Sequence, residues 1–270
     1  MLRTLACKCR GFCLLCLGVT SVRMTQNIYD DEKFFAGYSQ LPRSLHGLSG
    51  APEWASLRAM LPEIAGLRVL DLGCGMGWFS RWAHAQSALT VTGIDVSEKM
   101  LARAKAESDA SIKYLCGDLD SLTLVRGSFD LVYSSLAFHY LKNLDVLLAE
   151  IAGALAAGGR LVFSAEHPMV TAPLNPGWVV DSEGYKAWPV NHYLEDGPRI
   201  TDWLSRGVVK QHRSFTTYIN LLIANGFRIL RIDEWGPTDA QVANYPSLMD
   251  ERHRPNFFLV SAEAASQMRS

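Results

Sequence analysis

Glycines at alternating positions offer a binding surface made of bare backbone. Gly73, Gly75 and Gly77 follow the apolar run Arg68–Leu72 and precede a helix-like segment that begins at Trp78. Because glycine lacks a Cβ atom, such a turn lets a ligand approach the main chain closely. The succession of strand, glycine turn and helix is typical of nucleotide-binding sites, including those of dinucleotide-binding proteins.

Two features separate this turn from the dinucleotide fingerprint. The fingerprint would place its third glycine at position 78, where this chain has Trp78. Asp71 lies directly upstream of the turn, whereas a pyrophosphate prefers an uncluttered helix N-terminus. An anion at this place suits a ligand that carries an amino group. An oxidoreductase of the dinucleotide class is therefore the less favoured alternative.

Two further carboxylates follow strand-like runs. Asp95 comes directly after Leu89–Ile94, and Asp118 comes shortly after Ser111–Leu115. Open α/β folds bind ligands at the carboxyl edge of the sheet, so both acids are expected near the glycine turn. Either acid alone could simply cap the helix that follows it. Occurring together behind the glycine turn, they favour contact with a ligand.

At this point the sequence resembles the class I S-adenosylmethionine-dependent methyltransferases, of the type 11 small-molecule kind. The resemblance covers residues 67–165 and extends more loosely to about residue 262. Five motifs carry it in order: Asp71-x-Gly73-x-Gly75-x-Gly77, Gly93-Ile94-Asp95-Val96-Ser97 with Lys99-Met100-Leu101, Cys116-Gly117-Asp118-Leu119, the central strand Ser128–Ser135, and Leu155–Val162.

The resemblance implies S-adenosylmethionine as the cofactor and a role for each matched residue. Asp95 would accept hydrogen bonds from both ribose hydroxyls, and Asp118 would hold the adenine amino group. Val96 and Met100 would lie against the faces of the adenine. The predicted cofactor-binding residues are Asp71, Gly73, Gly75, Gly77, Asp95, Val96, Met100, Asp118, Leu119 and Ser134.

The fold class expected is α/β, because short strand-like runs alternate with helical patterns. The remaining runs are the strands 129–134, 160–165, 227–235 and 256–262, and the helices 78–86, 97–107, 143–157 and 215–225. The last two strands have no predicted helix between them, so they should form an antiparallel hairpin. The resemblance implies a Rossmann-like, seven-stranded, mostly parallel sheet in the order 3-2-1-4-5-7-6, with helices on both faces and strand seven antiparallel.

Residues 168–213 interrupt this alternation. They hold five of the eleven prolines and three of the seven tryptophans, and they are too long for a simple connector. We expect a substrate lid at this position, after the fifth strand, within a single methyltransferase domain of residues 24–270. Residues 24–66, with helices at about 30–38 and 53–61, are expected to pack as lid helices near the same edge.

Methyl transfer requires aligned reactants, exclusion of water and, for some acceptors, removal of a proton. His139 and His167 follow the fourth and fifth strands and are the predicted catalytic residues, although lone histidines on loops are often structural. Aromatic residues around the lid suggest an apolar acceptor, and core packing explains many of them equally well. The predicted substrate-lid residues are Tyr38, His192, Tyr193, Arg199, Trp203 and His212. The histidines show no metal-ligand spacing, so no metal is predicted.

Charge argues against a nucleic-acid partner. The net charge is −1, and residues 1–23 contain four basic residues and no acid, so the remainder carries 22 basic against 27 acidic residues. An acidic body without a basic run does not attract a polyanion. We therefore expect a small-molecule acceptor. A nucleic-acid methyltransferase and a non-catalytic S-adenosylmethionine-binding module are the alternatives, and the sequence leaves open a monomer or a homodimer.

Cysteine usage indicates the compartment. Four of the six cysteines lie in residues 1–23, and the two in the body, Cys74 and Cys116, give no disulfide framework. A cytoplasmic protein is expected, or a mitochondrial one if residues 1–23 are a presequence. A secretory or anchor segment and an upstream extension before Met24 are the other interpretations. The apolar run 11–19 is too short to span a bilayer, so no membrane span is predicted.

Replacement of Asp95 by alanine should weaken cofactor binding severely, because each charge-assisted hydrogen bond to a ribose hydroxyl contributes roughly 1.5–3 kcal/mol. Titration calorimetry of the full chain with S-adenosylmethionine measures the loss. An affinity equal to that of the unaltered chain would contradict the role assigned to Asp95.

Overall fold

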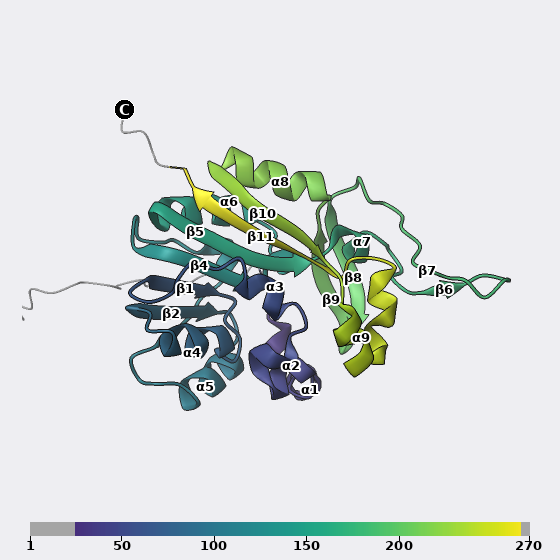
Figure 1. Ribbon diagram of the computed structural model, residues 1–270, viewed down its shortest axis with the longest axis horizontal. Helices are drawn as coiled ribbons and strands as arrows, with labels where there is room; N and C mark the ends of the chain where they lie inside the picture. Colours follow the sequence, from purple (N-terminus) through teal and green to yellow (C-terminus); the bar gives the residue numbers. More distant parts are fainter. Residues whose placement is uncertain (1–24, 266–270) are drawn as a thin grey trace, which may run out of the picture.

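In the computed structural model, which describes residues 25–265, a seven-stranded sheet forms the centre of the molecule (Figure 1). The order across it is β10 (Phe227–Trp235), β11 (Phe257–Ala264), β5 (Leu155–Glu166), β4 (Phe129–Ser135), β1 (Arg68–Leu72), β2 (Thr90–Asp95) and β3 (Lys113–Cys116). Strand β11 runs antiparallel to both of its neighbours, and the other pairings are parallel. This confirms the predicted order, with β11 as strand seven and β10 as strand six.

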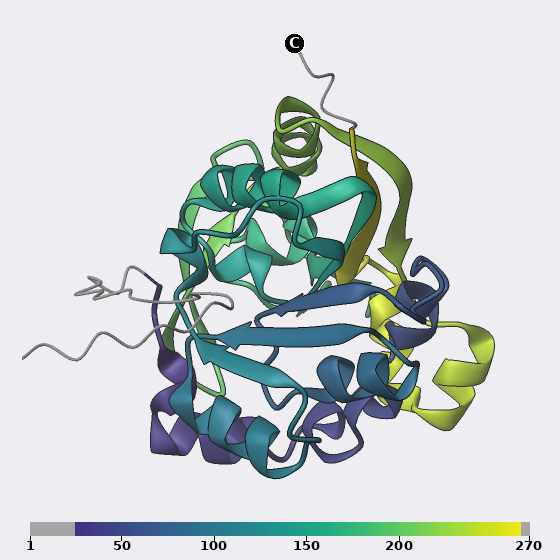
Figure 2. The same cartoon turned by 90° about the vertical axis from the view of Figure 1, so that its left-hand side faces the viewer.

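Helices cover both faces of the sheet (Figures 1 and 2). Helices α3 (Trp54–Arg58), α4 (Trp78–Ala85) and α5 (Glu98–Ala106) pack on one face, and α6 (Leu144–Ala154) and α8 (Phe215–Ala224) pack on the other. Helix α6 buries Leu144, Leu147, Leu148 and Ile151, a spacing that puts one apolar stripe against the sheet. The two apolar layers fix the sheet and hence the positions of its strand ends.

Two connections differ from the sequence prediction. Helix α6 ends at Ala154 rather than at residue 157, and the chain enters β5 at Leu155, with the left-handed turn at Gly158 (φ +75°) lying inside the strand. The loop expected between β10 and β11 contains α9 (Asp239–Asn244) and the 3-10 helix η5 (Pro246–Arg252). Thr238 and Gln241 form a capping box for α9. Both helices are short and largely polar, so they lack the apolar periodicity from which a helix is predicted.

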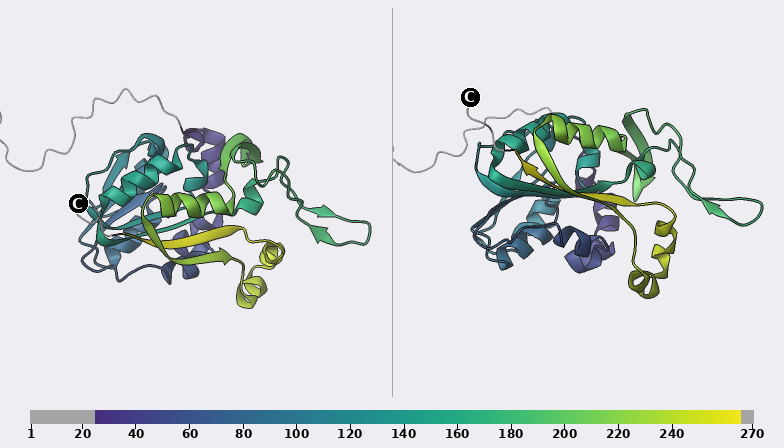
Figure 3. Two further views of the ribbon diagram at one scale, coloured as in Figure 1. Left: turned by 90° about the horizontal axis from the view of Figure 1, so that it is seen from above. Right: turned by 45° about the horizontal axis from the view of Figure 1, so that its top comes forward.

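The insert after β5 folds into a short helix and two hairpins. Its elements are α7 (Pro168–Thr171), β6 (Val179–Val180), β7 (Lys186–Ala187), β8 (Gly197–Trp203) and β9 (Ser205–His212). The β6–β7 hairpin stands away from the rest of the molecule in both views of Figure 3. Strands β8 and β9 pair with each other and not with the central sheet.

The N-terminal elements pack against the insert. They are η1 (Ile28–Asp30), α1 (Glu32–Tyr38), α2 (Pro42–Leu45) and η2 (Gly47–Gly50). Phe34 of α1 is fully buried, and its ring meets the edge of Trp203 from β8 with the ring centroids 5.6 Å apart. The two segments predicted as lids therefore meet each other above the sheet edge.

Within residues 25–265, no helix has the length and apolar character needed to cross a membrane. The predictions made for residues 1–23 concern a segment outside the described residues.

A substitution at Gly77 tests how tightly the glycine turn is packed. Its φ of +76° is left-handed, and a Cβ atom there would lie 2.3 Å from the Tyr114 hydroxyl oxygen. Gly77→Ala should therefore lower the free energy of unfolding by roughly 2–4 kcal/mol, from backbone strain plus overpacking. Urea denaturation followed by circular dichroism measures this loss.

Gly66→Ala is the matched control, since Gly66 has φ +77° and open space around its Cβ position. It should cost only the backbone strain, about 1–2 kcal/mol. Equal losses in the two variants would contradict the packing explanation.

Candidate functional site

A cavity of about 520 Å³ lies at the carboxyl edge of the sheet. The glycine turn after β1, the end of β2, the start of η3 (Leu119–Ser121) and the end of β4 form its floor. Residues of α1, the insert and the segment before β11 close it from above. A smaller cavity of about 100 Å³ adjoins it and shares Tyr38, Arg43, Gly73, Gly75 and Ser135 with it.

The glycine turn and the second strand are joined by a hydrogen bond. The backbone N–H of Gly75 donates to Asp95 Oδ2 at 2.8 Å. A Cβ atom at Gly75 would meet nothing within 4 Å, so the bare backbone there faces open space in the cavity. Gly73 also lines the cavity, and a Cβ atom on it would lie 2.5 Å from that of Ala137. Gly77 does not line either cavity and serves packing instead.

Asp95 lies in the wall of the larger cavity with a polar environment of its own. Its Oδ1 accepts a hydrogen bond from the backbone N–H of Ser97 at 2.9 Å. Burial raises the pKa of its carboxyl, and the nearby Asp30 carboxylate adds to this. The cap of α5 is Ser97, whose hydroxyl accepts from Met100 N. Asp95 is thus not the helix cap, which was the alternative explanation for it.

Asp71 lines the smaller cavity. It is 2% exposed, and it accepts a hydrogen bond from Ser80 Oγ at 2.7 Å. Burial raises the pKa of this carboxyl to about 7, the Ser80 hydrogen bond opposes the rise, and the Asp95 charge adds to it. An ammonium group or another cation entering this cavity would meet a carboxylate short of positive partners.

The structure places Asp118 outside the larger cavity, contrary to the predicted direct contact. Its carboxylate accepts hydrogen bonds from Thr25 Oγ1 at 2.6 Å, Thr25 N at 3.1 Å and Asp120 N at 3.0 Å. Asp118 therefore caps η3 and anchors the start of the described chain. Its neighbour Leu119, which was predicted to bind the cofactor, lines the cavity, as do Val96, Met100, Thr25 and Gln26.

Ser134 was also expected at the cofactor and lies elsewhere. Its hydroxyl donates to the Leu72 carbonyl oxygen at 2.8 Å in the sheet interior. Ser135 lines the cavity instead. Successive side chains of a strand point to opposite faces, so an error of one position moves a residue out of the site.

His139 lies in η4 (Phe138–Tyr140) and lines the larger cavity. Its Nδ1 accepts from the backbone N–H of Glu166 at 3.3 Å, which assigns the ring proton to Nε2. Burial lowers the pKa of this imidazole to about 4; the Glu166 charge opposes this, and the Lys210, Arg213 and Arg43 charges assist it. At neutral pH His139 is an uncharged hydrogen-bond donor at Nε2 and a weak base.

His167 does not reach the larger cavity, so the structure gives no support to its predicted catalytic role. Its Nδ1 accepts from Met169 N at 3.1 Å and caps α7, and its Nε2 pairs with Glu234 Oε1 at 2.7 Å. The ring also stacks on Phe215. Both nitrogens are used in holding the start of the insert.

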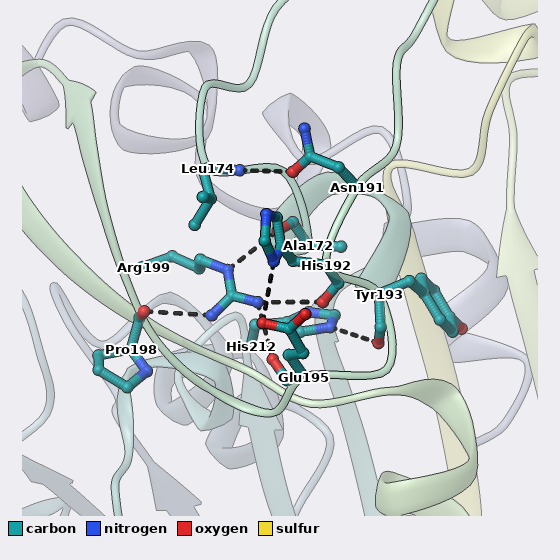
Figure 4. A network of polar contacts seen from close by, with 9 residues as sticks. All are labelled: Ala172, Leu174, Asn191, His192, Tyr193, Glu195, Pro198, Arg199 and His212. Carbon is teal, nitrogen blue, oxygen red and sulfur yellow. Dashed lines mark hydrogen bonds and ion pairs between the residues drawn. The ribbon is translucent and has the colours of Figure 1, made fainter.

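Of the six predicted lid residues, Tyr38, Arg199 and Trp203 line the larger cavity, and His192, Tyr193 and His212 do not. Figure 4 shows why. Arg199 donates to the carbonyl oxygens of Ala172, His192, Glu195 and Pro198 at 2.9, 3.1, 2.7 and 3.2 Å. His212 bridges Thr171 Oγ1 and the Tyr193 carbonyl oxygen. This polar network fixes the path of the insert.

Several charged residues of the cavity were not predicted. Lys210 Nζ contacts the two carboxylate oxygens of Glu166 at 2.6 and 2.8 Å, and Arg254 Nη1 lies 3.0 Å from Glu251 Oε2. Arg43 of α2 also lines the larger cavity. Glu166 stands at the end of β5, where strand topology could have marked it. The others come from segments without a motif.

Comparison with known proteins identifies the family. The methyltransferase domain family matches residues 70–163. The crystal structure of an S-adenosylmethionine dependent methyltransferase from Mesorhizobium loti is similar to this chain with a TM-score of 0.78 and 55% identity, over 80% of this chain and 100% of that one. The chain belongs to the S-adenosylmethionine-dependent methyltransferases. S-Adenosylmethionine is its cofactor.

Relatives of this methyltransferase differ in how much of the chain they match. An uncharacterized protein of Haemophilus influenzae is 32% identical over 87% of this chain and 96% of its own length. Malonyl-[acyl-carrier protein] O-methyltransferase of Pectobacterium atrosepticum is 37% identical over 45% of this chain. The chain spans 47% of that enzyme's length, so the similarity does not extend over the whole of that enzyme.

The raised pKa of Asp71 gives the methyltransferase a testable pH dependence. In the folded chain this carboxyl keeps its proton up to about pH 7, whereas the ordinary pKa of an aspartate is 3.8. The folded state then binds more protons than the unfolded state between these values, so the contribution of Asp71 to stability falls as pH rises through that window.

The substitution Asp71→Asn removes this titrating carboxyl and with it the dependence of stability on its protonation. The free energy of unfolding of the variant minus that of the unaltered chain should rise between pH 4 and 7, by on the order of 4 kcal/mol in total. Above pH 7 this difference should level off. Urea denaturation of both proteins at pH 4–8 checks this. A difference that is independent of pH would mean that Asp71 is ionised throughout.

Proposed function

We propose that this methyltransferase transfers a methyl group from S-adenosylmethionine to a small-molecule acceptor held under the insert. One observation carries the proposal: a single cavity runs from Asp95 and the glycine turn to Trp203 and Lys210 of the insert. Donor and acceptor sites are then two ends of one space, closed by residues 25–66 and 168–213 acting as lids. A space of this kind favours a small acceptor over a polymer.

The residues at the floor suit the cofactor. The open backbone at Gly75 and the carboxylate of Asp95 form a cradle that a side chain at position 75 would fill. We assign Asp95 to the ribose hydroxyls, and Val96, Met100 and Leu119 to the adenine, since all four line this end. Asp71 would face the amino group from the smaller cavity. When bound, S-adenosylmethionine supplies a methyl group on a positively charged sulfonium.

The upper residues would orient the acceptor and exclude water. Tyr29, Tyr38 and Tyr140 line the cavity, and burial raises the pKa of each phenol, so all three stay uncharged at neutral pH. Tyr29 packs edge-on against both Phe34 and Tyr38, and so does Trp203. Such a wall offers apolar faces with hydroxyl groups at its margin.

We assign His139 to positioning the acceptor rather than to removing its proton. Its pKa of about 4 makes it a weak base at neutral pH, whereas its Nε2–H is available for donation into the cavity. Burial raises the pKa of the Glu166 carboxyl, but the Lys210 and Arg254 charges oppose it and the pKa is lowered, so Glu166 stays ionised beside Lys210. With a lowered pKa and both oxygens bonded to Lys210, Glu166 is a weak base as well, so we assign it too to positioning the acceptor.

The proposal is tested in two steps with the full chain. Titration calorimetry should detect binding of S-adenosylmethionine to the protein. Incubation of the protein with S-adenosylmethionine and a metabolite extract should then produce S-adenosylhomocysteine. Heat with the donor but no product from any extract would favour a binding module without turnover. Turnover only with RNA or DNA would contradict a small-molecule acceptor.

His139→Phe should lower kcat by roughly a hundredfold with the acceptor so found, because a phenyl ring fills the space of the imidazole without its N–H donor. Its affinity for S-adenosylmethionine should be unchanged, because His139 lies toward the acceptor end. His84→Phe, on the outer surface of α4, is the matched control and should retain full activity. An equal kcat in both variants would remove His139 from the site.

A further inference from the structure

The upper part of the larger cavity contains more buried cations than carboxylates to match them. Arg199, Lys210 and Arg254 line it, and all three side chains are buried. Lys210 Nζ lies 2.6 Å from Glu166 Oε1, and Arg254 Nη1 lies 3.0 Å from Glu251 Oε2. Both of these acids also line the cavity. The two pairs are neutral, so the charge of Arg199 is left over.

Two arginines at this end have no carboxylate in their hydrogen bonds. Within residues 25–265, Arg199 donates only to backbone carbonyl oxygens. Arg213 is buried, its Nη2 donates at 2.6 Å to the carbonyl oxygen of Leu141 in the cavity wall, and its Nη1 has no partner in the same part of the chain. Asp202 lines the cavity too, but it is exposed to water. Because a buried charge is costly without a counterion, this end favours an anionic ligand.

Arg254 is the cation with unused donors. Its Cζ lies 4.1 Å from the ring centroid of Trp188 and 5.1 Å from that of Trp178. Its Nη1 donates to Glu251 and to Asn256, each at 3.0 Å. Both bonds leave from Nη1, so Nη2 lies outside them, and Nε is buried with no partner among residues 25–265. Two rings and one nitrogen thus fix a planar guanidinium that can still bind an anion.

We propose that the acceptor is a small anion whose carboxylate or phosphate group is bound by Arg254. This inference rests on the proposed function and names the class of molecule that the cavity accepts. The guanidinium matches either group in shape and charge. Glu251 would keep one nitrogen of Arg254, and the surplus charge of Arg199 would balance the second anion. The aromatic wall around Tyr38 and Trp203 would hold the rest of the acceptor.

Separation of a metabolite extract on an anion-exchange resin at neutral pH provides the first test. The retained fraction contains the anions, and the unretained fraction contains neutral molecules and cations. With the full chain and S-adenosylmethionine, the retained fraction should yield S-adenosylhomocysteine. Prior treatment of that fraction with a phosphatase should abolish the product if the group is a phosphate and leave it unchanged if the group is a carboxylate. Product from the unretained fraction alone would overturn the proposal.

Variants then test Arg254 with the acceptor purified from the retained fraction. Arg254→Gln should raise KM about tenfold to a hundredfold and change kcat far less, as expected for the loss of a charge-assisted contact that serves binding. Arg254→Lys should recover part of the loss, because it keeps the charge without the planar fork. Arg252→Gln is the matched control and should keep the original KM, since Arg252 is an exposed arginine of η5 that does not line the larger cavity.

Titration calorimetry with S-adenosylmethionine shows whether each variant is folded, and the affinity should equal that of the unaltered chain. A double variant, Arg254→Gln with Glu251→Gln, avoids leaving Glu251 without its cation and should show the same rise in KM. An unchanged KM in both variants would mean that Arg254 does not bind the acceptor. Loss of donor affinity in both would make Arg254 a structural residue only. If the donor binds and no fraction yields product, the proposed function fails and this inference falls with it.

Discussion

The hydrogen bond from Gly75 N to Asp95 Oδ2 joins the two strand ends on which the site is built. It needs a bare backbone after β1 and an acid at the end of β2, and the parallel pairing of these strands places the two side by side. Burial of the carboxylate makes the bond strong, since a charge with little solvent depends on its hydrogen-bond partners. The floor of the larger cavity follows from this one contact.

The upper half of the site depends on segments that do not belong to the sheet. Helix α1 and strand β8 meet through Phe34 and Trp203, and Gln26 joins the start of the described chain to β9. The Gln26 amide donates to the Gly207 carbonyl oxygen at 2.9 Å and accepts from Val209 N at 2.9 Å, which completes part of an open strand edge. These contacts hold the N-terminal segment and the insert together.

The sequence predicted the parts of the molecule that local patterns determine. Strand ends and helix starts near Asp95 and Gly77 follow from apolar runs and glycine positions, and the sheet order, which the structure confirms, was implied by the resemblance to the methyltransferase family. The structure does not bring Asp118 and Ser134 into the larger cavity: Thr25, far away along the chain, binds the Asp118 carboxylate, and Ser134 points into the sheet interior. Arg43 and Lys210 were missed for the same reason: each reaches the site through tertiary packing, far along the chain from any motif.

The buried Asp71 has a consequence for the heat of donor binding. With a pKa of about 7, this carboxyl is close to half protonated at neutral pH before any ligand arrives. A cation placed beside it would lower that pKa, and up to about half a proton would pass to the buffer. The enthalpy observed for the donor would then vary with the ionisation enthalpy of the buffer chosen, whereas a ligand without a positive charge at that end would give the same heat in every buffer.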